Sequence, residues 1–379
     1  MFKSVVLFFA ILLFLFGFGK IKESKFQTED DAAILKKVYE KDFYIGAAIN
    51  DKIITEKNKK ALEVLKREFN TISPENVMKW EALHPSPDTY NFDMADKYVA
   101  LGKKNNMHVI GHTLLWHSQI GPWMNSVQDS ATMANYIKEH ITTVTNRYSG
   151  KIDGWDVVNE ALNEDGSLRE SVFFKVMGER YLEFAFKVAE KADPSAELYY
   201  NDYNMWKPKK REGAIRLIEN LQKSGTKING VGMQGHWGLT EPSLEDVENS
   251  IVAYSKLGLK VAITELDITV LPNPFKLEGA EISQNFENNE KMNPYPDALP
   301  DSVEVQLANR YRDIFELFLK HSDKIDRVTF WGVNDQSSWL NNWPIKNRTN
   351  YPLLFDRKFE AKKAYHAVTQ LKTDSIKQQ

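Results

Sequence analysis

The chain has 379 residues and a formal net charge of −3, a length that suits one large α/β domain or two ordinary ones. Charges of both signs are interspersed, which excludes a basic stripe for nucleic acid or a polybasic patch for anionic lipid. The sequence contains no cysteine, which excludes disulfides, thiolate nucleophiles, thiolate metal sites and a lipid-modified amino-terminal cysteine.

The amino terminus has the composition of a targeting segment. Lys3 gives a positive start, and residues 5–18 are apolar apart from Gly17. This run is closer to a signal-peptide core than to a membrane span of about 20 residues, and an uncleaved anchor is the alternative. We therefore expect an exported protein, secreted or periplasmic. The predicted division is a signal peptide at 1–20, a polar linker at 21–36, a catalytic domain at 37–373 and a polar tail at 374–379.

Strand-like and helix-like runs alternate along the rest of the chain. Strands are predicted at 43–49, 69–72, 107–116, 152–158, 197–200, 228–233, 261–266 and 327–333. Helices are predicted at 55–67, with Thr55 as the N-cap, and at 94–104, 131–148, 173–191, 208–224, 243–254, 303–319 and 361–371. Such alternation predicts a single (β/α)8 TIM barrel. An open doubly wound sheet is the alternative, but no G-x-G-x-x-G motif follows the first strand.

Polar and aromatic residues collect where the predicted strands end, which is where the active site of a TIM barrel lies. Any one of these residues could instead have a structural role, such as fixing the conformation of a loop or filling the end of the barrel. Because polar residues occur at the same end of most strands, an active site is the favoured interpretation. The residues are Glu75, Asn76, Lys79, His112, Trp116, His117, Asn159, Glu160, Tyr203, Gln234, His236, Glu265, Asp267, Trp331, Asp335 and Trp339.

Carboxylates are the reactive groups that this sequence offers. It has no cysteine, no serine-nucleophile elbow and no phosphate-binding loop. Glu160 and Glu265 each follow a short apolar run at the end of a predicted strand. Two carboxylates are what a retaining glycosidase needs, one as acid/base and one as nucleophile. We hypothesise that Glu160 is the acid/base and Glu265 the nucleophile.

The neighbours of these glutamates suggest supporting roles. Asn159 cannot share a face with Glu160 in an ideal strand, so a bulge or strand end must turn both into the pocket. Asn159 would then bond the sugar 2-hydroxyl. We expect His236 to donate to Glu265, and Asp267 to orient His236.

A metal site is the competing use of the histidines. His112 and His117 are five residues apart on a strand and point to opposite faces. The sequence contains no H-E-x-x-H motif. We therefore predict no metal and no cofactor.

The ordered set of motifs resembles glycoside hydrolase family 10, which consists chiefly of endo-β-1,4-xylanases. The motifs are ENVMKWE, GHTLLWHS, WDVVNEAL, YNDYN, GVGMQGHW, ITELDI and WGVNDQSSWL, and the resemblance runs from about Tyr39 to about Leu371. It implies a (β/α)8 barrel with Glu160 as acid/base, Glu265 as nucleophile and net retention. The implied partners are xylan and xylo-oligosaccharides, and we expect a monomer.

The resemblance also implies positions for the substrate. Glu75, Asn76 and Lys79 would bind the sugar on the non-reducing side of the cleaved bond. Tyr203 would be a platform on the reducing side. The cleavage subsite would be lined by His112, Trp116, Asn159, Gln234, His236, Trp331 and Trp339. Bulky residues such as Trp331 and Trp339 can close over xylose, which lacks the hydroxymethyl group of glucose.

Two features depart from the family pattern. Leu340 stands where the family often has a basic residue, and the loop at 272–300 is longer than usual. We expect this loop to reshape reducing-side subsites or to contact xylan side groups, and so to tune product length or decoration. A β-1,4-glucanase and a non-catalytic polysaccharide-binding protein are the functional alternatives.

Overall fold

The computed structural model describes residues 34–377, with side chains described up to residue 372. The predicted signal peptide and the linker up to residue 33 lie outside the described residues. The strands are β1 (Tyr44–Ile49), β2 (Thr71–Pro74), β3 (His108–Trp116), β4 (Gly154–Asn159), β5 (Glu197–Asp202), β6 (Gly230–Met233), β7 (His236–Gly238), β8 (Lys260–Thr269) and β9 (Ile325–Phe330).

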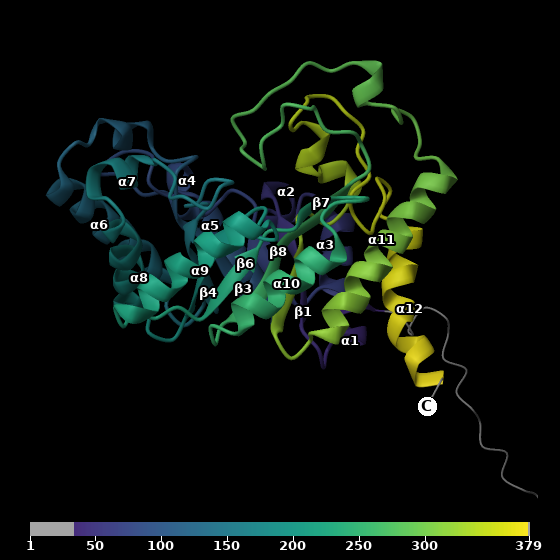
Figure 1. Ribbon diagram of the computed structural model, residues 1–379, viewed down its shortest axis with the longest axis horizontal. Helices are drawn as coiled ribbons and strands as arrows, with labels where there is room; N and C mark the ends of the chain where they lie inside the picture. The colour runs from purple at the N-terminus through teal and green to yellow at the C-terminus, as the bar shows by residue number, and fades with distance from the viewer. Residues whose placement is uncertain (1–33, 378–379) are drawn as a thin grey trace, which may run out of the picture. The chain divides into compact units, whose positions relative to one another are not determined.

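Helices connect and surround these strands (Figure 1). The α-helices are α1 (Leu35–Val38), α2 (Asp51–Ile54), α3 (Lys59–Glu68), α4 (Trp80–Leu83), α5 (Asp93–Lys104), α6 (Ser130–Tyr148), α7 (Val172–Met177), α8 (Arg180–Ala192), α9 (Pro208–Lys223), α10 (Leu244–Ser255), α11 (Asp301–Lys320) and α12 (Lys363–Lys377). Short 3-10 helices are η2 (Pro122–Ser126), η3 (Glu290–Met292), η4 (Asp335–Ser337) and η5 (Trp339–Asn341).

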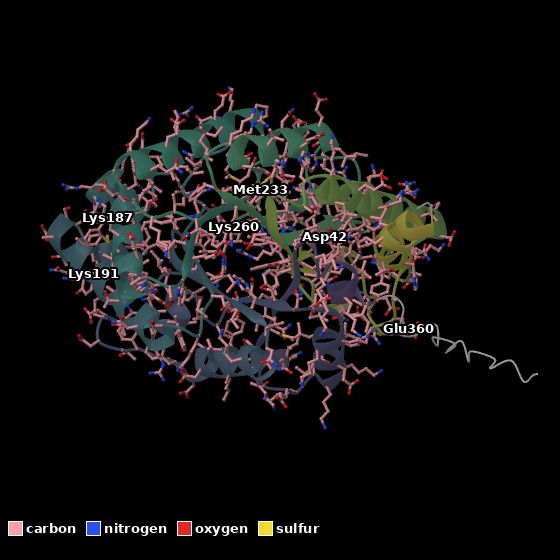
Figure 2. The ribbon with its side chains drawn as sticks, turned by 90° about the horizontal axis from the view of Figure 1, so that it is seen from below. Asp42, Lys187, Lys191, Met233, Lys260 and Glu360 are labelled. Atoms are coloured by element: carbon pink, nitrogen blue, oxygen red, sulfur yellow. The ribbon has the colours of Figure 1, made fainter. Side chains whose placement is uncertain are left out.

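The strands close into a parallel barrel. Their order is β6-β5-β4-β3-β2-β1-β9-β8, and β6 also pairs with β8, which joins the two ends of the sheet. The short strand β7 follows β6 and pairs with the later part of β8, with His236 opposite Asp267. In Figure 2, Met233 on β6 and Lys260 on β8 lie in the central part, while Lys187 and Lys191 on α8 lie toward the rim. The predicted TIM barrel is confirmed, and the open doubly wound sheet is wrong.

The helices pack apolar stripes against the barrel. On α11, Leu307, Tyr311, Ile314 and Phe318 are spaced three or four residues apart and are fully buried, as expected for one face of a helix. The ring centroid of Tyr311 lies 6.0 Å from that of Phe330 on β9. This packing fixes the strands whose ends carry the site.

Several predicted helix boundaries are wrong. Asn50 caps the short helix α2 and Asn58 caps α3, so Thr55 ends one helix instead of starting the next. The predicted helix at 173–191 is divided between α7 and α8 by Gly178, which has φ = 64°, a conformation that glycine adopts without steric cost. Helix α12 continues to Lys377, into the predicted polar tail.

The long loop at 272–300 connects β8 to α11 and contains only the 3-10 helix η3 within the described structure. It forms the arch above the barrel in Figure 1. The loop is tied to the segment after β9, since Arg348 Nη1 donates to Pro272 O at 3.0 Å and Tyr351 Oη donates to Tyr295 O at 2.9 Å. These contacts place the loop over the carboxyl ends of the strands.

Candidate active site

A cavity of about 160 Å³ lies at the carboxyl ends of the strands. Most of the predicted site residues line this cavity; the exceptions are His117, Tyr203, Asp267 and Asp335. Three further residues line it that the sequence analysis did not select: Gln119, Ala280 and Ile282. The barrel therefore brings together side chains from the ends of β2, β3, β4, β6, β8 and β9, with two more from the loop after β8.

Glu160 directly follows β4 and has φ = 56°. This left-handed backbone costs about 1–3 kcal/mol for a residue other than glycine. It is how both Asn159 and Glu160 come to line one cavity, as predicted. The carboxylate is buried and accepts hydrogen bonds from Trp116 Nε1 at 2.7 Å and Gln234 Nε2 at 2.9 Å. The Glu160 backbone N–H donates to Asn201 O at 2.8 Å, which holds the turn.

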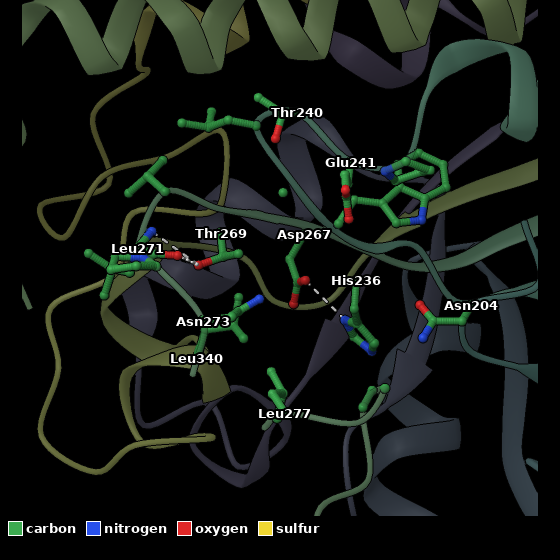
Figure 3. A pocket seen from close by; sticks show the side chains of 18 of the residues that line it. Asn204, His236, Thr240, Glu241, Asp267, Thr269, Leu271, Asn273, Leu277 and Leu340 are labelled. Atoms are coloured by element: carbon green, nitrogen blue, oxygen red, sulfur yellow. Dashed lines mark hydrogen bonds and ion pairs between the residues drawn. The ribbon is translucent and has the colours of Figure 1, made fainter. Parts of the chain in front are cut away.

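Glu265 lies on β8, and its carboxylate is held by side chains from β5 and β7. Its Oε1 accepts from Asn201 Nδ2 at 2.9 Å, and its Oε2 lies 3.2 Å from His236 Nε2. His236 Nδ1 lies 3.0 Å from Asp267 Oδ1, and Asp267 Oδ2 accepts from Trp339 Nε1 at 2.7 Å. The pairing of β7 with β8 sets this chain of contacts, which matches the one predicted for His236 and Asp267 (Figure 3).

The two glutamates have pKa values shifted in opposite directions. Burial raises the pKa of Glu160 above its usual range. Burial would also raise the pKa of Glu265, but the hydrogen bond from His236 and nearby positive charge hold it below the usual value. Burial alone would lower the pKa of His236, yet the charge of Asp267 and its hydrogen bond raise it to about 10. His236 is therefore a cation at neutral pH, Glu265 is ionised, and Glu160 retains its proton to higher pH.

A second group of polar residues lies at the end of β2. Lys79 Nζ donates to Asn76 Oδ1 at 3.0 Å and to Gln119 Oε1 at 2.8 Å, and it lies 4.8 Å from the ring centroid of Trp116. Burial raises the pKa of Glu75 to about 7 and lowers that of Lys79. This group offers donors and acceptors at close range, as sugar hydroxyls require.

Aromatic rings form another wall of the cavity. Trp331 lies edge-on to the ring of His112 at 5.6 Å, and Trp339 stacks on Trp343 at 4.4 Å. His112 Nδ1 lies 2.9 Å from Asp156 Oδ2, a contact that fixes the orientation of the imidazole. Rings held in this way can pack against the faces of a sugar.

Other residues from strand ends do not line the cavity. Tyr203 is 4% exposed, with its hydroxyl accepting from Arg169 Nη2 at 2.7 Å and its ring 3.6 Å from Lys210 Nζ. Asp335 is fully buried and accepts from Lys362 Nζ at 2.8 Å. Asp335 is thus part of the structural core beneath the segment after β9.

Two residues outside the predicted set contact the catalytic candidates directly. Asn201 lies in the motif YNDYN at the end of β5, and its position at a strand end was the available signal. Arg169 lies in the loop after β4 and donates from Nε to Glu160 O at 3.0 Å. No pattern in the sequence singles out Arg169, because it is defined by a contact that only the folded chain makes.

The described region contains neither a metal-binding cluster nor a membrane-spanning helix. Within residues 34–377, no three or more acidic, histidine or cysteine side chains are arranged to hold a metal ion. In the same region, every helix is too short or too polar to cross a membrane.

Known proteins share this sequence and this fold. A family model described as Glycosyl hydrolase family 10 matches residues 34–371. The chain is 42% identical to Endo-1,4-beta-xylanase A of Xylanibacter ruminicola, over 89% of this chain and 93% of that protein. It is 40% identical to Beta-1,4-xylanase of Dictyoglomus thermophilum, over 95% and 96% of the two chains.

Solved structures give the same result. A GH10 endoxylanase retrieved from a sugarcane soil metagenome superimposes with a TM-score of 0.87 at 44% identity, covering 89% of this chain and 99% of the other. A GH10 protein from Paenibacillus barcinonensis superimposes with a TM-score of 0.82 at 32% identity, covering 90% and 98%. With its closed barrel and its paired buried glutamates, this chain belongs to glycosyl hydrolase family 10.

Proposed function

We propose that this protein is a retaining endo-1,4-β-xylanase, which hydrolyses internal β-1,4-xylosidic bonds of xylan by double displacement. The observation that carries the assignment of roles is that two buried carboxylates share one cavity, Glu160 held by Trp116 and Gln234 and Glu265 held by His236 and Asn201, with surroundings that shift their pKa values in opposite directions. A pair of titratable groups whose surroundings separate their pKa values identifies the acid and the nucleophile. The names of the xylanase relatives supply the substrate class.

In the first step, the protonated carboxyl of Glu160 gives its proton to the glycosidic oxygen as the C1–O bond breaks. The ionised carboxylate of Glu265 attacks C1 from the opposite face and forms a glycosyl ester. The cation at His236 and the amide of Asn201 hold Glu265 ionised and oriented before this attack.

In the second step, the carboxylate of Glu160 removes a proton from water as the water oxygen attacks C1. The C1–O bond to Glu265 breaks, the carboxylate is restored, and two inversions give net retention. The hydrogen bonds from Trp116 and Gln234 keep Glu160 in place for both proton transfers.

The remaining predicted residues would bind the sugar chain. Glu75, Asn76 and Lys79 would hold the non-reducing side, and Asn159 would bond the 2-hydroxyl of the sugar being cleaved. Trp331 and Trp339 stand over the cavity, where the hydroxymethyl group of glucose would add bulk. This packing favours xylose because small differences in ring substituents are discriminated by close contact.

The test is hydrolysis of xylan and of soluble cellulose, with the anomeric form of the first product followed by NMR. We expect xylan to be cleaved much faster, with the β-anomer appearing first. Equal rates on both polymers would support the β-1,4-glucanase alternative, and binding without product would support the non-catalytic one. An α-anomer appearing first would overturn the double displacement.

Export is a separate part of the proposal. The apolar run at 5–18 would direct the chain out of the cytoplasm as a signal peptide, and the mature protein would act as a monomer. Amino-terminal sequencing of protein from the culture fluid or periplasm tests removal of residues 1–20, and light scattering tests the monomer. A protein that retains Met1 in a membrane fraction would support the anchor alternative.

A further inference from the structure

One segment of the long loop crosses the catalytic cleft. We call Gly279–Ile282 the strap. Ala280 and Ile282 line the catalytic cavity, although both belong to the loop after β8. On the other side of the strap lies a larger cavity of about 600 Å³, which Figure 3 shows from close by. Ala280 and His236 line both cavities, so the strap separates two spaces that meet beside His236.

A charged side chain fastens the strap to the barrel. Glu281 Oε2 accepts from Arg169 Nη1 at 2.9 Å and lies 3.0 Å from His117 Nε2. His117 follows β3 and Arg169 follows β4, so the anchors come from two neighbouring strand ends. The three side chains are 14–22% exposed, which leaves these contacts only partly screened by water. We call this set of contacts the latch.

The latch lies on the leaving-group side of the cleft. Arg169 donates from Nε to Glu160 O and from Nη2 to the Tyr203 hydroxyl, while its Nη1 holds Glu281. A general acid must stand beside the oxygen that it protonates, which belongs to the leaving group. The strap is therefore anchored next to the acid/base, where the departing sugars must pass.

The backbone of the strap also covers Tyr203. Gly279 has φ = 58°, and a Cβ atom at this position would lie 2.4 Å from Tyr203 Cε2. Such close approach requires glycine. With Lys210 Nζ 3.6 Å from the ring centroid and the strap against the ring edge, Tyr203 has no face free for a sugar.

The small size of the catalytic cavity also indicates that the strap restricts access to it. Its volume of about 160 Å³ is below the about 300–1,000 Å³ of ordinary ligand pockets. We propose that the latched strap selects substrates by the size of the leaving group, admitting a small aglycone when closed and a xylan chain only when open. This inference rests on the proposed function and assigns Glu281 as a specificity-determining residue.

The strap makes the binding of polymer depend on the fraction of protein in which it is open. If a polymer binds only the open form, its apparent dissociation constant is the intrinsic value divided by the open fraction. Weakening the latch raises that fraction and lowers KM for polymer, while a small substrate that fits both forms is unaffected. Loss of a charge-assisted hydrogen bond is enough to change the open fraction by about tenfold.

The experiment compares Glu281→Ala with a matched control, Glu278→Ala, which removes the same charge from an exposed position on the same loop. The substrates are soluble xylan and 4-nitrophenyl β-xylobioside, whose leaving group is small. We expect E281A to raise kcat/KM on xylan about tenfold, mainly through KM, with less than about twofold change on the aryl substrate. E278A should change neither value.

Three outcomes would count against the strap. An equal change on both substrates would mean that Glu281 acts only through the position of Glu160. A loss confined to xylan would mean that the strap binds polymer, and no change on either substrate would mean that the latch does not limit access. If the unaltered protein hydrolyses neither substrate, the proposed function itself fails, and the role of the strap fails with it.

Discussion

Two regions bury carboxylates near the end of a barrel strand: the catalytic cavity, and the cluster of Asp335 and Lys362 after β9. The surroundings of the carboxylates differ between the two. Asp335 is satisfied by Lys362, whose Nζ also donates to the carbonyls of Tyr351 and Leu353. Glu160 and Glu265 instead face the catalytic cavity, where burial raises the pKa of Glu160 and the hydrogen bond from His236 helps to hold that of Glu265 below its usual value. A buried carboxylate whose charge is matched within the protein is part of the structure, and breaking its pair destabilises the fold, whereas one that faces a cavity is available for chemistry.

The largest expected effect is the loss of activity in Glu265→Ala. Removal of the nucleophile should lower kcat on xylan by more than about 10⁴-fold, beyond the usual contribution of one acid–base group. The midpoint of thermal unfolding should change little, because His236 keeps Asp267 as its counter-charge. Kinetics and calorimetry on the same preparation check both statements, and near-normal turnover would remove Glu265 from the mechanism.

Glu160→Ala should lower kcat on xylan by about 10²–10⁴-fold, the range of general acid–base catalysis. An aryl xylobioside with a good leaving group needs no proton donor, so its first step should be nearly unaffected. Azide should then accelerate turnover by attacking the glycosyl ester, giving a β-glycosyl azide. The comparison of the two substrates separates a lost proton donor from a distorted site, which would slow both.

Asp335→Ala should lower stability and leave kcat nearly unchanged, the reverse of what is expected for Glu265→Ala. It leaves the Lys362 ammonium buried without its counter-charge, which destabilises a protein by about 3–5 kcal/mol. Denaturant unfolding measures this loss. The kcat of the protein that remains folded should be close to normal. A large loss of kcat without a loss of stability would mean that Asp335 takes part in catalysis, as Glu265 does.

His236→Asn should have the smallest of these effects, about tenfold in kcat/KM near neutral pH, the worth of a charge-assisted hydrogen bond. His236 helps to hold the pKa of Glu265 below its usual value. Without the cation, Glu265 binds a proton at higher pH, so the acid limb of the kcat/KM profile should move to higher pH. The alkaline limb, which reports loss of the proton from Glu160, should stay in place. An acid limb that does not move would assign it to another group.

Much of the fold could be predicted from the sequence because each β/α unit carries its own local pattern. Eight strand-like runs separated by helix-like runs are enough to indicate a closed parallel barrel. The boundaries were less accurate, since Asn50 and Asn58 compete with Thr55 as caps and only the folded chain shows which is used. The short strand β7 was missed, because three residues are too few to show a period.

The site was predictable where its residues stand at strand ends and not where they come from loops. Glu160, Glu265 and His236 are positioned by strands, whose ends converge in any barrel. The partners of Glu281 are 164 and 112 residues away along the chain, and nothing in the loop sequence indicates them. Asp335 was selected for the same reason as Glu265, and only its contact with Lys362 shows that it is structural.

The backbone at Glu160 has a consequence for the evolution of this enzyme. Its φ of 56° is a conformation that glycine would adopt with less strain. A change to glycine at this position would relieve the chain and remove the group that shuttles protons in both steps. Screening for heat resistance alone would tend to accept such a change, so selection of hardier variants has to be coupled to a measure of turnover.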